Sequence, residues 1–419
     1  MAGDWQETKI IDVVQINTAA YSTNEKWEYV NYLDTSNNTN GQIAEIQLIS
    51  DMNILPSRAR RKVKAGDIVY STVRPNQKHY GIIKEPKDNM LVSTGFAVLR
   101  GKNQISYTKF LYYFLIQNHI VEKLQTIAEH STSAYPSIRP SDIESLKLKL
   151  PPFAEQQAIA HILGTLDDKI ELNRKMNKTL EEMARAIFKS WFVDFDPLHA
   201  KAAVRRDHPN WTNAQVSRAA LPNLSPEIAE LFPDALEDSD LGEIPKGWAV
   251  ETVGNICEFA YGKALKADQR QPGRVLVMGS NGQVGTHNEA LVKGPGIVVG
   301  RKGNPGIVTW VNSNFFPIDT TFYVVPKRLE YPLTFLLYAL ENLNLASLGA
   351  DSAVPGLNRN IAYRSQLIIP DNKILKAFEI YATTTHNRQG MSEKEIHDLT
   401  ALRDTLLPKL ISGELRIKD

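Results

Sequence analysis

Both halves of this chain carry segments in which arginine and lysine stand beside asparagine and glutamine. Arginine and lysine neutralise phosphates, whereas paired hydrogen bonds let arginine read guanine and let asparagine or glutamine read adenine. These residue types are therefore equipped for contact with DNA. In the first half the candidates are Arg58, Arg60, Arg61, Lys62, Lys64, Arg74, Asn76, Gln77 and Lys78. In the second half they are Lys263, Lys266, Arg270, Arg274, Asn281, Gln283, Arg301, Lys302 and Asn304.

Each candidate also has a plainer interpretation. The run from Arg58 to Lys64 is equally well explained as a solvated charged turn. Gly282 and Gly303 are better explained as turn residues than as contacts. Loop geometry decides which side chain reaches a base edge, so the sequence assigns no base to any residue.

No pattern in the sequence predicts catalysis or metal binding. Pro151-Pro152-Phe153 is similar to the end of the Asp/Asn-Pro-Pro-Tyr/Phe motif of amino-methyltransferases, but Leu150 stands where that motif needs a hydrogen-bond acceptor. The glycines between 294 and 303 lack the Gly-Lys-Ser/Thr of a phosphate-binding loop. The histidines show no zinc-ligand spacing, and Cys257 has no nucleophile motif around it. We therefore expect no active site, no metal and no cofactor in this chain.

The chain repeats itself at a constant offset in residue number. Ser133-Ala134-Tyr135-Pro136 returns as Ser352-Ala353-Val354-Pro355, and the same offset places Leu148 on Leu367 and Ile159 on Phe378. Such a period is far too long for a solenoid. The sequence therefore predicts two copies of one domain-plus-helix unit, an internal repeat with circular pseudo-symmetry.

The elements that must hold the candidate loops follow from this repeat. Residues 1–150 and 246–370 are predicted to be mixed α/β, strand-rich domains, with strands at 68–73 and 96–99 and helices at 109–116 and 331–340. Residues 194–245 are punctuated by proline and are predicted to be a linker. Its Phe232 and the following Trp248 indicate that this linker packs against the protein.

Two long helices are predicted over residues 151–193 and 371–419. Mostly apolar residues recur every seven positions, with a companion set three residues later, and together they form a stripe, or seam, along each helix. A seam of this width cannot remain exposed to water. Antiparallel pairing as a coiled coil is the predicted solution, with Asn173 and its repeat mate Ser392 fixing the register. The alternative is that each helix packs only on its own domain. The predicted seam contains Ile159, Ile162, Leu166, Asn173, Leu180, Met183, Ile187, Phe378, Leu399, Leu402 and Leu406.

Composition places the chain among globular proteins. Its 419 residues are 42% hydrophobic and 23% charged, which predicts two to three domains. One cysteine fits a reducing cytoplasm, and no signal peptide or long apolar run predicts a membrane partner. The net charge is only +1, so any basic surface must be local.

Several motifs together resemble one family. The segment from Leu150 to Gln157, Leu-Pro-Pro-Phe-Ala-Glu-Gln-Gln, and the segment 167–174 resemble the central conserved region of type I restriction–modification specificity subunits. Residues 64–76, 279–282, 300–303 and 317–321 resemble parts of their target-recognition domains, and 410–415 resembles the family's ending. The resemblance covers essentially the whole chain.

This resemblance implies a prokaryotic, non-catalytic subunit that reads double-stranded DNA. Each target-recognition domain would read one half of a bipartite site, and the paired helices would set the gap and dock two methyltransferase subunits. Restriction subunits with translocase activity can join them. S-adenosylmethionine would belong to the methyltransferase partner, and ATP and Mg to the restriction partner.

Two points stand against a simple transfer of the family's properties. In the second helical region Pro370-Asp371-Asn372 replaces Leu-Pro-Pro-Phe and Gly390 interrupts the middle, so docking at that end is expected to be weaker or differently shaped. A non-enzymatic coiled-coil scaffold, or a DNA-binding protein outside restriction–modification, is the alternative. A scaffold would explain the helices but not the basic, amide-bearing loops in both copies.

Overall fold

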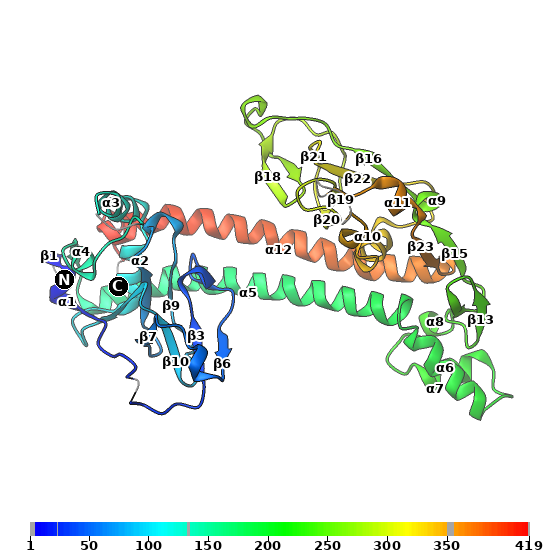
Figure 1. Cartoon of the computed structure of the whole chain (residues 1–419), viewed down its shortest axis with the longest axis horizontal. Coiled ribbons are helices and arrows are strands. Elements are labelled where there is room, and N and C mark those ends of the chain that lie inside the picture. Colours follow the sequence, from blue (N-terminus) through cyan, green and yellow to red (C-terminus); the bar gives the residue numbers. More distant parts are fainter. Residues whose placement is uncertain (1–4, 23, 132–134, 350–355, 418–419) are drawn as a thin grey trace. The chain divides into compact units, whose positions relative to one another are not determined.

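The computed structural model describes residues 5–22, 24–131, 135–349 and 356–417 and divides into two compact units (Figure 1). The first unit comprises Met1–Leu172 with Glu395–Asp419, and the second comprises Asn173–Lys394. Each unit is a mixed α/β domain with two antiparallel helical segments, as predicted. The motif residues Ser133 and Ala134, and residues 352–355 of the second copy, lie outside the described residues.

The first unit is built mainly from short strands. Its strands are β1 (Gln6–Lys9), β2 (Val14–Ile16), β3 (Val30–Leu33), β4 (Asn38–Thr39), β5 (Gln42–Ile43), β6 (Gln47–Ile49), β7 (Ala59–Lys62), β8 (Ile68–Ser71), β9 (Tyr80–Ile82), β10 (Met90–Ser93), β11 (Phe96–Gly101) and β12 (Lys147–Leu150). Its α-helices are α1 (Ile10–Val13), α2 (Thr108–Leu115), α3 (Asn118–Glu129), α4 (Pro140–Glu144) and the start of α5 (Phe153–Phe192). Short 3-10 turns are η1 (Thr35–Asn37), η2 (Met52–Ile54) and η3 (Pro75–Gln77).

Two four-stranded sheets form this domain. One has the order β2-β11-β8-β9 and the other the order β6-β3-β10-β7, while β1 pairs with β12. Every residue of β8 and of β10 is buried, which matches their continuous runs of apolar and small residues. Helix α2 buries six successive residues, Phe110 to Leu115, in the core of the first sheet.

The second unit repeats this set of elements. Its strands are β13 (Leu236–Ser239), β14 (Gly242–Pro245), β15 (Ala249–Thr252), β16 (Cys257–Tyr261), β17 (Val275–Gly279), β18 (Gly282–His287), β19 (Gly296–Gly300), β20 (Val308–Val311), β21 (Phe315–Pro317), β22 (Thr321–Pro326) and β23 (Gln366–Ile369). Its helices are the end of α5, α6 (Asp196–Asp207), α7 (Asn213–Ala220), α8 (Pro226–Ala229), α9 (Val253–Ile256), α10 (Leu333–Asn342), α11 (Arg359–Arg364) and the start of α12 (Asn372–Ser412), with 3-10 turns η4 (Ala267–Gln269) and η5 (Leu345–Gly349).

The strand topology confirms the internal repeat. The sheet β16-β22-β19-β20 has the same order as β2-β11-β8-β9, and β17 pairs in parallel with β21 as β3 does with β10. The chain enters each copy identically, because Ile10 N donates to Leu146 O and Val253 N to Ser365 O, both at 2.9 Å. Strand β7 is reduced in the second copy to a bridge between Val292 and Phe315.

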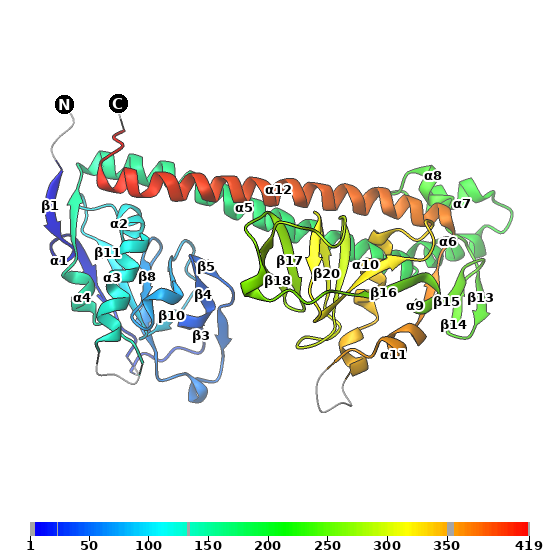
Figure 2. The ribbon, with the colours of Figure 1, turned by 90° about the horizontal axis from the view of Figure 1, so that it is seen from above.

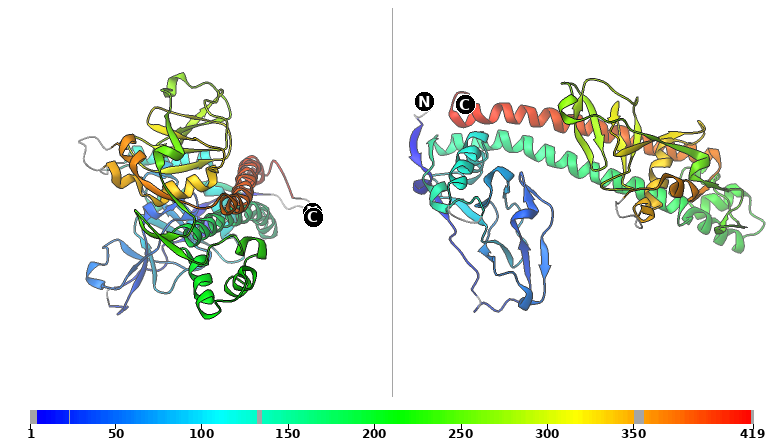
Figure 3. Two further views of the ribbon diagram at one scale, coloured as in Figure 1. Left: turned by 90° about the vertical axis from the view of Figure 1, so that its right-hand side faces the viewer. Right: turned by 45° about the horizontal axis from the view of Figure 1, so that its top comes forward.

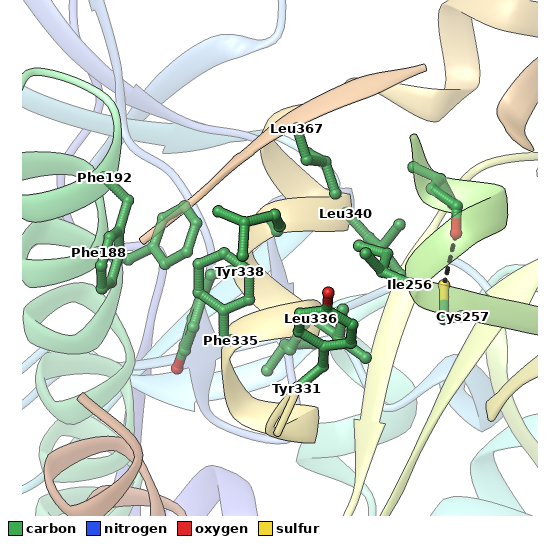
Figure 4. Packing of buried hydrophobic residues seen from close by; sticks show 14 of the residues in the cluster. Phe188, Phe192, Ile256, Cys257, Tyr331, Phe335, Leu336, Tyr338, Leu340 and Leu367 are labelled. Carbon is green, nitrogen blue, oxygen red and sulfur yellow. Dashed lines mark hydrogen bonds between the residues drawn. The ribbon is translucent and has the colours of Figure 1, made fainter. Parts of the chain in front are cut away.

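The core of the second unit joins the domain to helix α5. Figure 4 shows Phe188 and Phe192 of α5 beside Phe335 and Tyr338 of α10. The Phe188 and Phe335 ring centroids are 5.7 Å apart, and those of Phe192 and Phe335 are 5.4 Å apart. Phe378 of α12 is fully buried in the same cluster. Aromatic rings bury large areas, so this contact anchors the domain on its helices.

Helices α5 and α12 run antiparallel within each unit (Figures 2 and 3). In the first unit Arg403 of α12 bonds Asp167 of α5 at 2.8 Å, and Lys169 pairs with Glu395 at 3.4 Å. In the second unit the Ser392 hydroxyl donates to the Asn173 carbonyl at 3.4 Å, both residues being buried. Repeat mates thus meet at the centre of the pair.

The predicted seam needs one correction. Ile159, Asn173 and Phe378 are buried, but Ile162, Met183 and Leu402 are 37%, 48% and 48% exposed. The buried companions in α5 lie four residues after the heptad positions instead of three: Leu163, Ile170, Ala184 and Trp191. Leu166, Leu180, Ile187, Leu399 and Leu406 are partly buried.

The junction of α5 with the first domain is held by Gln156, which is fully buried. Its Oε1 accepts from Tyr107 N at 2.7 Å, and its Nε2 donates to Pro151 O at 2.9 Å and to Ile105 O at 3.0 Å. Tyr107 is the N-cap of α2, and its side chain makes no capping hydrogen bond. The Gln156 amide oxygen therefore supplies the acceptor for the backbone N–H at the start of the helix.

The second copy solves the same problem differently. Leu375 is buried on α12 where α5 has Gln156, and the N-cap of α10 is Pro332, in the place of Tyr107. Proline has no N–H. Because no donor needs a partner there, an apolar side chain suffices.

Residues 194–245 fold as α6, α7, α8 and the hairpin of β13 and β14. The buried Lys201 ammonium donates to Asn213 Oδ1 at 2.8 Å, to Ala229 O at 3.1 Å and to Phe232 O. Burial lowers the pKa of Lys201, which the Asp234 carboxylate opposes. Lys201 of α6 is thereby bonded to α7, to α8 and to the turn that follows α8.

Candidate functional site

The loop after β8 presents polar side chains on a rigid turn. Arg74 and Lys78 cap η3 at either end with φ of 47° and 56°, around the buried Pro75. Asn76 N donates to Gln125 Oε1 of α3 at 3.2 Å, and Lys78 Nζ donates to Asn118 Oδ1 at 3.4 Å. The side chains of Arg74, Asn76 and Gln77 remain exposed. A loop fixed by its backbone can offer these groups in one orientation.

The second basic segment of the first domain, 58–64, divides into structural and exposed residues. Lys62 pairs with Glu25 and lies 5.1 Å from the Trp27 ring centroid. Arg61 donates to Thr94 O at 3.5 Å, and burial lowers its pKa. Arg58 and Lys64 are exposed, and Arg60 is partly buried. Arg58, Arg60 and Lys64 therefore keep the better access to a ligand.

In the second domain the loops between strands converge. Asn304, after β19, donates to Asn281 in the turn between β17 and β18. Lys263, after β16, donates its backbone N–H to Pro317 O at 3.0 Å, at the end of β21. The structure thus brings Lys263, Asn281 and Asn304 to adjoining loops, with Lys302 exposed in the same loop as Asn304.

Arg301 is held against an aromatic ring in this region. Its Nη1 donates to Asp319 O at 3.1 Å, and its guanidinium lies 4.9 Å from the Tyr261 ring centroid. Arg359, the first residue of α11, lies 4.8 Å from the same ring. The sequence interpretation missed Arg359 and Tyr261. A comparison of the two copies could have singled out the arginines, because the first copy has Thr72 in the place of Arg301 and Pro140 in the place of Arg359.

The remaining candidates of the second domain stand apart from these loops. Arg270 Nη1 donates to Val284 O at 2.6 Å, and its Nε is buried without a hydrogen-bond partner. The guanidinium therefore stabilises the backbone of β18. Gln283 donates to Gly285 O at 3.4 Å within the same strand. Lys266 and Arg274 are exposed.

The loop after β8 and the loop after β19 occupy equivalent places in the two copies. Ile138 N bonds Thr72 O at 2.8 Å, as Leu357 N bonds Arg301 O at 2.9 Å. Thr72 is therefore the counterpart of Arg301, and Arg74 is the counterpart of Gly303. Arg74 and Gly303 share a positive φ, 47° and 84°.

Two kinds of chemical group, clusters of metal ligands and the cysteine thiol, can be examined in the described part of the chain. No group of three or more His, Cys, Asp or Glu is placed to hold a metal ion among residues 5–22, 24–131, 135–349 and 356–417. Cys257 is buried, its thiol donates to Val253 O at 3.6 Å, and burial raises its pKa to about 12. Its thiolate is therefore scarce at neutral pH. No helix in the described part is long and apolar enough to span a membrane.

Comparisons with known proteins agree with this architecture. Residues 2–182 match the model of the type I restriction modification DNA specificity domain. The chain is similar to the type I restriction enzyme HindI specificity subunit of Haemophilus influenzae, with 27% identity over 98% of this chain and 100% of that protein. It is 25% identical to the MjaIX specificity subunit of Methanocaldococcus jannaschii, over 81% and 76% of the two chains.

A solved structure shares the fold. The crystal structure of the type I restriction-modification system S subunit from M. genitalium matches with a TM-score of 0.60 and 17% identity. The match covers 97% of this chain and 96% of the other.

Proposed function

Since this chain belongs to the family of type I restriction–modification specificity subunits, we propose that it is the non-catalytic subunit that recognises DNA for such a complex. The observation that carries this proposal is the repeated domain, which presents different polar loops at equivalent places. One copy offers Arg74, Asn76 and Gln77, and the other offers Arg301, Lys302 and Asn304. Two domains of one topology with different loops suit a site made of two different half-sequences.

The proposed division of labour leaves chemistry to the partners. Two methyltransferase subunits would bind S-adenosylmethionine, and restriction subunits would use ATP and Mg. The assembly would act on the chromosome in a prokaryotic cytoplasm. We expect the purified chain alone neither to methylate nor to cleave DNA.

Exposed apolar residues on the α5 and α12 segments of each unit are the proposed docking positions for methyltransferase subunits. Besides Ile162, Met183 and Leu402, Ile380 is 71% exposed and Met391 67% exposed. Ile380 and Met391 belong to the second unit and lie about three turns apart on α12, so they share one face of that helix and are available together to a partner. Ile380→Lys with Met391→Lys should reduce co-purification of the methyltransferase subunit, whereas Lys394→Ala, at a surface charge of the same helix, should not.

The function is tested by expressing the chain with its methyltransferase partner in a methylation-free host and sequencing the methylated bases. A bipartite adenine-methylated motif should appear only when both proteins are present. Replacing residues 1–150 with the domain of a relative should change one half of that motif. Adenine methylation that follows no motif in the coexpression experiment would contradict the proposal. A domain swap that changes both halves of the motif together would also contradict it.

A further inference from the structure

We propose that Tyr261, Arg301 and Arg359 form a clamp for one backbone phosphate of the DNA that the second domain binds. This inference rests on the proposed function and adds a ligand group and two residues to it. The phosphate clamp is the name used below for these three side chains.

The geometry of the clamp fixes both cations. Tyr261 is 48% exposed at the end of β16, with the Arg301 and Arg359 guanidinium groups 4.9 and 4.8 Å from its ring centroid. Arg301 Nη1 donates to Asp319 O at 3.1 Å, and Arg359 Nη1 donates to Phe259 O at 3.5 Å. A guanidinium has five N–H donors. Each arginine is therefore oriented through one N–H and keeps further donors for a ligand.

The charge of the clamp calls for an anion. In the described part of the chain, neither guanidinium forms an ion pair with a carboxylate. Two like charges beside one ring repel each other, and the cation–π contacts with Tyr261 offset only part of that repulsion. A bound anion removes the remainder.

A phosphate fits this pair better than a base does. The two non-bridging oxygens of a phosphodiester can accept hydrogen bonds from two guanidinium groups at once. A guanine offers O6 and N7 to a single arginine and carries no charge to balance two cations. The pair therefore points to the DNA backbone.

The clamp is not part of the scaffold that the two copies share. Strand register places Phe259 opposite Val324 and Ile16 opposite Leu99 in equivalent ladders, so Thr18 occupies the place of Tyr261. Thr72 is the counterpart of Arg301, and Pro140 begins α4 as Arg359 begins α11. The first domain folds with the same sheet order without any of the three side chains. Their role is therefore specific to the second domain.

The test uses the full chain assembled with its methyltransferase subunits and a labelled duplex. The slope of log affinity against log salt should fall by about one unit in the Arg301→Gln, Arg359→Gln double variant and by less in either single variant, because the two arginines share one phosphate. Arg301→Lys and Arg359→Lys should keep most of the slope. Arg328→Gln, at an exposed arginine paired with Glu330, is the charge-matched control and should leave the slope unchanged.

Duplexes carrying a single neutral methylphosphonate linkage locate the phosphate. One linkage near the second half-site should weaken wild-type binding but leave binding of the Arg301→Gln, Arg359→Gln double variant unaffected. Equal sensitivity of both proteins at every linkage would overturn the clamp. A changed second half of the methylated motif in the single variants would also overturn it, because the arginines would then read bases. If the wild type bound unmodified duplexes of every sequence equally while the linkage effect persisted, the proposed sequence recognition would fail and the clamp would stand.

Discussion

Replacing Gln156 by leucine should destabilise the first unit by breaking the junction between α5 and α2. The change removes the acceptor of Tyr107 N and the donor to Pro151 O, both within a buried or partly buried site. Ile105 is half exposed, so its carbonyl can find water instead. Leucine fills a similar volume, and the expected loss therefore comes from unsatisfied polar groups.

The magnitude follows from those two groups. A buried polar group that loses its partner costs about 1–3 kcal/mol, so the free energy of unfolding should fall by about 2–6 kcal/mol for the two groups. In a domain of this size each kcal/mol lowers Tm by roughly 2–4 °C, which gives a shift on the order of 10 °C. The exposed neighbour Gln157 is the matched control, and Gln157→Leu should stay within about 0.5 kcal/mol of wild type.

The assay combines thermal unfolding with amide hydrogen exchange. The Tyr107 amide and the first turn of α2 should lose protection in Gln156→Leu, while the second unit keeps its exchange pattern. The second copy suggests a compensating change, because it combines Pro332 with Leu375. Adding Tyr107→Pro removes the orphaned N–H, so the double variant should be less destabilised than the sum of the single variants by about 1 kcal/mol.

Two results would refute this reasoning. One is a Gln156→Leu variant as stable as Gln157→Leu, which would mean that the amide contributes nothing net. The other is strict additivity of Tyr107→Pro and Gln156→Leu, which would show that the N–H and the amide do not stabilise each other.

Three further predictions concern the helices. Burial lowers the pKa of His386, which bonds Tyr338 at 3.2 Å and lies in the same network as Glu181. The folded state therefore favours the neutral imidazole, and thermal scans should show stability falling as pH drops below about 6.5. His386→Gln should flatten this trend, whereas the exposed His397→Gln should not. Phe378→Ala should cost about 3–5 kcal/mol in denaturant unfolding, with an intact Tm contradicting its place in the core. Inserting four residues after Asn173 should lengthen the unread gap of the methylated motif by about one or two base pairs, because ~6 Å is added with the apolar face nearly in phase. Inserting two residues should instead prevent assembly, because it rotates the downstream helix by ~200°. An unchanged gap in a well-assembled four-residue variant would show that helix length does not set the gap.

The sequence predicted the fold because the repeat and the heptads are strong, redundant signals. It misplaced the companion seam positions because Ile162 and Leu163 are both apolar, and a heptad tolerates spacings of three and of four. Only the packing of Leu163 in the core decides between them.

The candidate site was less accessible from sequence because its parts are distant in the chain. Residues 261, 301 and 359 meet only because β16, β19 and α11 pack in one domain. Residue type also gave no sign that the Arg270 guanidinium bonds the backbone of β18, and its contact with DNA stays a prediction. Local charge predicts surface, and it cannot distinguish a contact to DNA from a contact to a nearby carbonyl.

The division of the chain into units has a consequence for its synthesis. The core of the first unit contains Leu407, Leu410 and Ile411 of α12 together with Ile10 and Ile159. A ribosome thus completes residues 173–394 of the second unit before it makes the segment that closes the first. At 5–20 residues per second, the first domain waits roughly 10–50 s for that segment. The part of the protein made first is therefore the last to be finished, and during that interval its unfilled core is exposed to chaperones and to aggregation.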